Sequence, residues 1–201
     1  MKDKYSGVIK ELSDKELLFH LYLTQIILLT ISGILGMILM DSFVEFLRLF
    51  QWNDKNILLI GGIAGLAVVI LDLFLMRVLP SSYYDDGGLN ERIFRNRSVL
   101  HIAFIAAVIA FSEELLFRGI IQTHAGLVIS SLIFAVVHYR YLFNWFLFSN
   151  IVLLSFFIGY LFLLTENLWV TIFMHFIIDF LLGVIIKIKY QNNKQEGMFH
   201  E

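Results

Sequence analysis

Residues 98–124 read SVLHIAFIAAVIAFSEELLFRGIIQTH, an apolar run whose second half carries Glu113, Glu114 and Arg118. About 20 mostly apolar residues are needed for a helix to cross a lipid bilayer. This stretch is long enough, and it places three charged side chains where lipid would surround the helix. Such side chains are costly in a membrane, so they usually face a bundle interior or a water-filled cavity. The stretch therefore predicts a membrane-spanning helix and a buried polar site on it.

The composition of the whole chain agrees with a membrane protein. Of its 201 residues, 59% are hydrophobic and 16% are charged, against about 25% charged in an average soluble domain. A soluble protein of this size cannot bury so much apolar surface, because surface area falls too slowly with mass. The absence of Cys excludes a Cys nucleophile and Cys metal ligands. The net charge of −2 indicates no nucleic-acid partner.

Apolar segments of spanning length recur along the chain. We predict an all-α, polytopic transmembrane bundle of about six spans, at 17–40, 56–79, 98–124, 126–148, 149–165 and 168–190. The expected organisation is an N-terminal part with a tail, two spans and a polar loop (1–97), a catalytic core (98–190) and a C-terminal tail (191–201). The predicted location is the cell membrane, as a multi-pass protein. The Lys-, Ile-, Asn- and Phe-rich usage favours a bacterial plasma membrane.

The placement of Lys and Arg predicts the orientation of the chain. With six spans and a cytoplasmic N-terminus, 12 of the 15 Lys and Arg residues lie on the cytoplasmic side. These are Lys2, Lys4, Lys10, Lys15, Arg77, Arg92, Arg95, Arg97, Arg140, Lys187, Lys189 and Lys194. Cytoplasmic loops carry an excess of positive residues. We therefore expect both termini in the cytoplasm.

The first polar cluster is Glu113-Glu114-Leu-Leu-Phe-Arg118. Arg118 follows Glu114 by four residues, on the same helix face, so the two can form an ion pair. Glu113 then points about 100° away from that pair. A carboxylate in apolar surroundings takes up a proton more readily, which suits Glu113 to act as a general base. The alternative is a buried ion cluster that only fixes helix packing.

Two further polar positions lie in apolar helices. Phe134 is followed four residues later by His138, and His175 four residues later by Asp179. The second spacing puts both side chains on one helix face, where they can fix a tautomer, donate to a substrate or ligate a metal. For each position the alternative is a packing role. A lone His on an apolar helix is more often a satisfied core residue than a catalyst.

Helix rise predicts that these residues meet. If the chain turns at Ala125–Gly126, Glu113 and His138 each lie about 18 Å below the same membrane face. If the next turn on that face is near Glu166–Leu168, Asp179 is also about 18 Å deep and His175 about 12 Å deep. Ionisable residues from three helices therefore converge on one layer near the middle of the membrane. Scattered packing residues would not be expected to share a depth.

The polar positions and their neighbours form motifs that resemble those of a known family. The motifs EELLFR (113–118), F-x-x-x-H (134–138) and H-x-x-x-D (175–179), with the segments SSLIFAVVHY and LWVTIFMHFIIDF, are similar to those of the CPBP family. This is the Abi or CAAX-protease-like group of intramembrane endopeptidases. It includes type II CAAX prenyl proteases and bacteriocin-processing and self-immunity proteins. The resemblance covers roughly residues 98–185.

The resemblance implies a role for each motif residue. Glu113 and His138 would activate a water, and His175 and Asp179 would stabilise the oxyanion. Arg118 would support the site, which fits its expected pairing with Glu114, and Phe134 belongs to the second motif. Many family members have Asn where this chain has Asp179. Asn can donate to an oxyanion, whereas Asp donates only when protonated and could instead orient His175.

The leading hypothesis is an intramembrane protease that hydrolyses a membrane-associated peptide or protein. No cofactor is firmly predicted; zinc held by Glu113, His138 and His175 is the alternative mechanism. Two non-proteolytic alternatives remain. One is a membrane interaction or immunity protein that binds a bacteriocin target or a sensor, and the other is a small proton-coupled transporter. The sequence does not define the oligomeric state.

Overall fold

A computed structural model of the protein describes residues 11–139, 141 and 144–199. The described residues form helices and connecting turns, as the all-α prediction requires. In chain order the elements are α2 (Asp14–Leu39), α3 (Phe43–Arg48), the π-helix η1 (Ile57–Gly62), α4 (Ile63–Val78), the 3-10 helix η2 (Ser81–Tyr83), α5 (Leu89–Phe94), α6 (Val99–Glu114), the π-helix η3 (Leu115–Gln122), α7 (Thr123–Val137), α8 (Trp145–Thr165) and α9 (Leu168–Phe199). Four of the residues used to predict orientation, Lys2, Lys4, Lys10 and Arg140, lie outside the described part.

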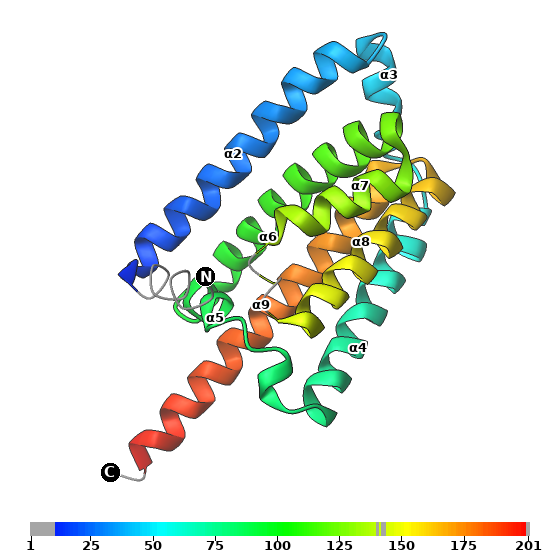
Figure 1. The fold of residues 1–201 in the computed structure, drawn as a ribbon. Coiled ribbons are helices and arrows are strands. Elements are labelled where there is room, and N and C mark those ends of the chain that lie inside the picture. Colours follow the sequence, from blue (N-terminus) through cyan, green and yellow to red (C-terminus); the bar gives the residue numbers. More distant parts are fainter. Residues whose placement is uncertain (1–10, 140, 142–143, 200–201) are drawn as a thin grey trace.

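The helices form one bundle around α9. This helix contacts α4, α5, α6 and α8, while α2 runs along the outer side of α6 (Figure 1). The C-terminal part of α9 extends beyond the ends of the other helices (Figure 1). Because α9 lies at the centre, side chains on several of its faces are enclosed by neighbouring helices.

Five helices of the described chain are long and apolar enough to cross a membrane. They are Asp14–Leu39, Ile57–Val78, Val99–Val137, Trp145–Thr165 and Leu168–Gln195. The chain is therefore a multi-pass membrane protein, as predicted. Five helical segments meet this criterion where about six spans were predicted, because the third and fourth predicted spans belong to one helical segment of 39 residues.

That long segment folds back on itself at Gly126. The backbone of Gly126 has φ 83° and ψ 168°, a left-handed conformation that glycine adopts without steric cost. After the turn, the hydroxyl of Ser130 donates to the carbonyl of Phe117 at 2.5 Å, so the two legs lie side by side. The turn expected at Ala125–Gly126 is thus present.

The predicted span 126–148 is not one continuous helix, because the helix after Gly126 ends at Val137. Eleven residues from Leu127 to Val137 rise only about 16 Å, too little to cross about 30 Å of hydrocarbon. The next helix begins at Trp145, where the side chain of Asn144 accepts hydrogen bonds from two backbone N–H groups. Hydropathy missed this boundary because aromatic residues surround it, but an Asn at an N-cap is a recognisable signal.

Glycines let α4 and α9 approach closely. A methyl group at Gly61 would lie 2.5 Å from the carbonyl oxygen of Val170, and one at Gly65 would lie 2.9 Å from that of Met174. Small residues at such contacts allow membrane helices to pack backbone against backbone. Gly61 of η1 and Gly65 of α4 thus serve helix packing, and they bring this segment against the part of α9 that carries His175.

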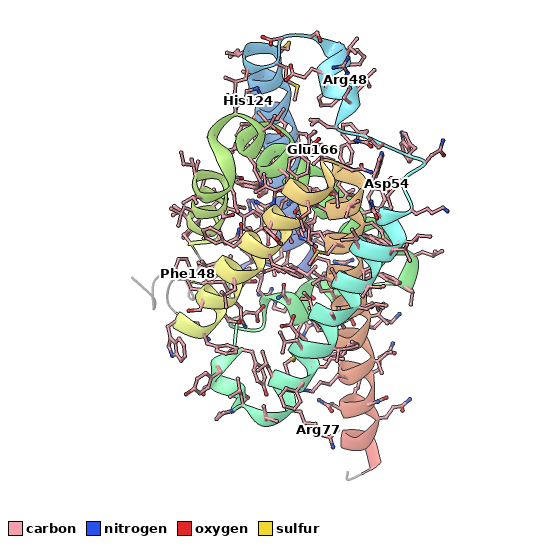
Figure 2. All side chains as sticks on the ribbon, turned by 90° about the vertical axis from the view of Figure 1, so that its right-hand side faces the viewer. Arg48, Asp54, Arg77, His124, Phe148 and Glu166 are labelled. Carbon is pink, nitrogen blue, oxygen red and sulfur yellow. The ribbon has the colours of Figure 1, made fainter. Side chains whose placement is uncertain are left out.

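The turn at Gly126 and the turn between α8 and α9 lie at one end of the bundle. Figure 2 places His124, Glu166, Asp54 and Arg48 at this end and Arg77 at the other. The turn before α9 is fixed by Asn167, which is fully buried. Its amide donates to the carbonyl of Gln51 at 2.9 Å and to Asp54 at 3.1 Å.

Hydrogen bonds from the backbone N–H of Asn56 and from the side chain of Asn167 hold the pKa of the Asp54 carboxyl below its usual value. The turn that sets the depth of α9 is therefore tied to the loop before η1.

Candidate active site

The polar residues singled out in the sequence converge inside the bundle. Glu113 and Glu114 end α6, His138 follows the last residue of α7, and His175 and Asp179 lie in α9. An oxygen of Glu113 is 3.9 Å from Nε2 of His138, and an oxygen of Glu114 is 2.9 Å from Nδ1 of His175. These contacts join α6 to α7 and α6 to α9. The predicted convergence of the three motifs is therefore present.

Glu114 is the centre of a buried ion cluster. Its Oε1 accepts a hydrogen bond from Nδ1 of His175, and its Oε2 lies 3.3 Å from Nε of Arg118. The second contact is a close ion pair whose N–H is not aligned for a hydrogen bond. Both Glu114 and Arg118 are fully buried. Burying two charges is tolerated only when partners compensate them, so this cluster ties α6 to α9.

Arg118 is held by hydroxyl groups from two other helices. Its terminal nitrogens donate to Oγ of Ser130 at 3.5 Å and to Oγ of Ser155 at 3.2 Å. Its guanidinium carbon also lies 5.2 Å from the ring centroid of Phe134, within the range of a cation–π contact. One side chain thus links η3 to α7 and α8.

A π-helix follows the glutamate pair directly. η3 covers Leu115–Gln122 and includes Arg118. π-helical turns are rare and occur frequently at functional sites. Their wider turn changes the direction of the side chains that follow, relative to an α-helix. The sequence carries no signal from which we could have predicted it.

Glu113 and His138 face one another. Nδ1 of His138 lies 2.9 Å from the carbonyl oxygen of Phe134. Since a carbonyl only accepts, Nδ1 carries a proton, and Nε2 has a lone pair whenever the ring is neutral. Nε2 lies 3.9 Å from an oxygen of Glu113. Two acceptors at this separation can both accept hydrogen bonds from one water molecule.

His175 lies between two carboxylates. While Nδ1 donates to Glu114, Nε2 lies 3.5 Å from Oδ2 of Asp179. A protonated ring can donate from both nitrogens at once. The Nε2 side of His175 is therefore suited to donate to an oxygen atom, either of Asp179 or of a bound ligand.

Burial separates the cluster into two halves. The side chains of Glu114 and Arg118 are 0% exposed, whereas those of Glu113, His138 and Asp179 are 11%, 18% and 27% exposed. The first pair is sealed from any ligand, while the other three residues are reachable. Glu113, His138 and Asp179 can therefore present two carboxyl groups and an imidazole to a molecule that reaches the cluster.

Several contacts of the site were not predicted. The sequence paired Glu114 with Arg118 alone, and its bond to His175 depends on how two helices face each other. Ser130 and Ser155 were also missed, although small polar residues in apolar helices are a known signal of interhelical hydrogen bonds. Buried Gln25 of α2 was missed too, and its Oε1 lies 2.5 Å from Oγ of Ser112, next to Glu113.

The donor set does not fit the zinc alternative. Within the described residues, no group of three or more His, Asp and Glu side chains is arranged to hold a metal ion. Nδ1 of His175 is bonded to Glu114, and its Nε2 lies beside Asp179. We therefore derive no reaction step through a metal.

The fold and this cluster define a multi-pass membrane protein with a buried Glu-Glu-Arg, His and His-Asp constellation. Residues 95–181 match the family described as type II CAAX prenyl endopeptidase Rce1-like. The chain is also 39% identical over 168 residues to the "Uncharacterized protein YpbD" of Bacillus subtilis (strain 168), over 84% of this chain and 89% of that protein. No solved structure matches the chain.

The protein belongs to the Rce1-like type II CAAX prenyl endopeptidase family, the CPBP or Abi group. The resemblance drawn from the three motifs is therefore confirmed. Because this is a protease family, an intramembrane protease activity is implied for the chain.

Proposed function

We propose that the protein hydrolyses a peptide bond of a membrane-associated peptide or protein, with Glu113 as general base. The observation that carries the proposal is the pair of facing acceptors on Glu113 and His138, 3.9 Å apart. The carbonyl of Phe134 fixes the ring of His138 in the orientation that points Nε2 at Glu113. A water bonded to both would be positioned and ready to lose a proton.

In the proposed reaction, Glu113 removes one proton from the water while the water oxygen attacks the scissile carbonyl carbon. The carbonyl π-bond opens and its electrons move to the oxygen, which becomes an oxyanion. The carbon–nitrogen bond then breaks as Glu113 returns the proton to the leaving amine. His138 orients the water, because it accepts one hydrogen bond from the water while Glu113 accepts the other. As the oxyanion electrons re-form the carbonyl, the carbon–nitrogen bond pair leaves with the amine, and the first products are a carboxylic acid and an amine. The acid then gives its proton to the amine, so the final products are a carboxylate and an ammonium group, and atoms and charges balance.

His175 and Asp179 are proposed to act on the oxyanion. Nε2 of His175 is directed to the reachable side of the cluster, where Asp179 is the most exposed member. Donors fixed before the reaction stabilise a developing negative charge without reorganising, and this is usually a large contribution to catalysis. The bond from Nδ1 of His175 to Glu114 keeps the ring oriented for this role.

Access of water is supported by where α7 ends. The helix stops at Val137, about halfway through the hydrocarbon by its length, and His138 follows it. Interrupted helices at membrane depth are tolerated only where the backbone is enclosed by protein or lines a water-filled space. A catalytic water beside His138 would fit such a position.

The test is cleavage of quenched fluorescent peptides by protein purified in detergent. Wild type should cleave, while Glu113→Ala and His138→Ala should lose activity by about 100-fold or more, with unchanged thermal unfolding. Protein from which metal has been removed should keep its activity in the presence of a chelator. Full activity of Glu113→Ala would overturn the assignment of the base, and loss of activity that zinc restores would favour a metalloprotease.

The same experiment also tests the alternative that the protein has no catalytic activity. If no variant cleaves and a cellular phenotype survives Glu113→Ala, a non-catalytic interaction or immunity protein is favoured. Bacteriocin processing and self-immunity stay predictions that rest on the resemblance, and the peptides preferred by wild type would narrow the substrate.

A further inference from the structure

A basic pocket lies at the end of the bundle opposite the α8–α9 turn. It has a volume of about 670 Å³ and is formed by the segment 95–98, between α5 and α6, and by the C-terminal part of α9. Four of its lining residues are cationic: Arg95, Arg97, Lys187 and Lys194. No Asp or Glu is among the described residues that line it. The pocket is thus suited to an anion.

Arg95 has a donor that nothing in the described chain uses. Its Nη2 donates to Asp14 at 3.0 Å, and its guanidinium lies 5.4 Å from the ring centroid of Tyr190. Its Nε is buried and has no hydrogen-bond partner among the described residues. A buried donor without a partner costs free energy. Asp14 at 3.0 Å and Glu91 at 3.9 Å hold the Arg95 side chain in place at the wall of the pocket.

The N-terminus of α6 adds to the positive character of the pocket. Ser98, the N-cap of this 16-residue helix, lines the pocket and accepts from the backbone N–H of His101. Backbone N–H groups and the helix dipole at such a terminus favour a phosphate or another anion. Here the helix terminus and the four cations act in the same place.

The depth of the pocket places it at the lipid headgroups. From Leu168, at the far turn, to Lys187 the axis of α9 rises about 29 Å, which is the thickness of the hydrocarbon core. Tyr190 and Lys194 follow within two further turns. Tyr and basic residues are typical of the membrane–water interface. An anion at this depth is bound where phospholipid phosphates are concentrated.

We propose that this pocket binds the phosphate group of an anionic phospholipid. Arg95 and Arg97 contact the phosphate from the α5–α6 side, and Lys187 and Lys194 from α9. The acyl chains of the lipid extend along the apolar surface of the bundle. Binding there would fasten the extended end of α9 to α5. The proposal does not depend on catalysis, so it applies equally to Glu113→Ala.

The experiment is native mass spectrometry of the protein released from detergent, with dioleoyl-phosphatidylglycerol or dioleoyl-phosphatidylcholine added. Wild type should retain phosphatidylglycerol in preference to phosphatidylcholine. Lys187→Gln/Lys194→Gln should weaken retention on the order of 30-fold, because each interfacial cation contributes about one factor of five. Arg97→Gln should weaken it in the same direction.

The control removes the same charge elsewhere. Arg77→Gln/Lys189→Gln changes two exposed cations that do not line the pocket, and it should retain phosphatidylglycerol as wild type does. Equal loss in both double variants would overturn the pocket in favour of diffuse surface charge. Full displacement of the lipid by millimolar inorganic phosphate would overturn the lipid as the source of the phosphate. Thermal unfolding without added lipid identifies any variant that has failed to fold, and Lys187→Arg/Lys194→Arg should restore retention.

Discussion

At the scale of single residues, two neighbouring glutamates are placed in opposite surroundings. Glu114 is sealed between Arg118 and His175, whereas Glu113 is partly reachable and faces His138. One peptide unit of helix turns a side chain by about 100°, which is enough to send one carboxylate to each half of the cluster. The pair therefore divides the work: one carboxylate holds the helices together and the other is available to a substrate.

The first prediction concerns Glu114. Glu114→Gln should lower the free energy of unfolding by about 3–5 kcal/mol, because it leaves the buried charge of Arg118 without its partner. Thermal unfolding in detergent measures the loss. Glu113→Gln is the matched control, since it removes the neighbouring carboxylate, and it should leave stability within about 1 kcal/mol of wild type. Equal destabilisation by both variants would contradict the division between the two residues.

The second prediction concerns Asp179. Asp179→Asn should keep peptide cleavage within about tenfold of wild type, because an amide can accept from His175 and can also donate to an oxyanion. Asp179→Ala should lower kcat about 100-fold or more, in the range of a lost oxyanion donor. Kinetics on a cleaved peptide distinguish the two. If the Asn and Ala variants were equally impaired, the carboxylate charge itself would be required.

At the scale of elements, close packing of helix backbones sets where the site residues meet. Gly61 of η1 and Gly65 of α4 bring this helical segment against the same part of α9 that carries His175. On the other side of the site, η3 directs Arg118 toward α7 and α8. The position of His175 is thus fixed in part by a helical segment, η1 and α4, that contributes none of the polar side chains described for the site.

The third prediction follows from this packing. Gly61→Val should impair both stability and cleavage, because a methyl group at this position would already lie 2.5 Å from the backbone of Val170. Gly33→Val in α2 is the control, since nothing lies within 4 Å of the same position there. Thermal unfolding and peptide cleavage should separate the two variants. A Gly61→Val protein as active as Gly33→Val would show that α4 does not position α9.

At the scale of the whole molecule, the five spans and the fold-back at Gly126 define which segments share a membrane face. Asp54 and Arg77 lie at opposite ends of the bundle (Figure 2). The charge distribution predicts that the end with Arg77 faces the cytoplasm. This orientation stays a prediction, as does the division of the chain at residues 97 and 190.

The fourth prediction tests the orientation, using the fact that the chain has no Cys. In intact cells, a membrane-impermeant thiol reagent should label Lys55→Cys. Arg77→Cys should be labelled only after the cells are permeabilised. Both positions are exposed, so access to the reagent depends on the side of the membrane. The reverse labelling pattern would show that the chain has the opposite orientation in the membrane.

The membrane location, most of the helices and the polar residues that meet inside the bundle could be predicted from the sequence alone. This was possible because apolar runs and the cost of charges in lipid are local properties that can be read along one chain. The turn at Gly126 was equally readable, because only glycine adopts its backbone conformation easily. Constant helix rise then placed Glu113, His138 and Asp179 in one layer.

Only the tertiary structure decided which atoms of that layer meet. The bond between Glu114 and His175, the cradle of Ser130 and Ser155 around Arg118, and the early end of α7 at Val137 depend on how helix faces are turned toward each other. In lipid every outward face is equally apolar, so hydropathy carries little information on rotation. Rotation is set by interhelical contacts, such as Gly61 on Val170, which exist only once the bundle has formed.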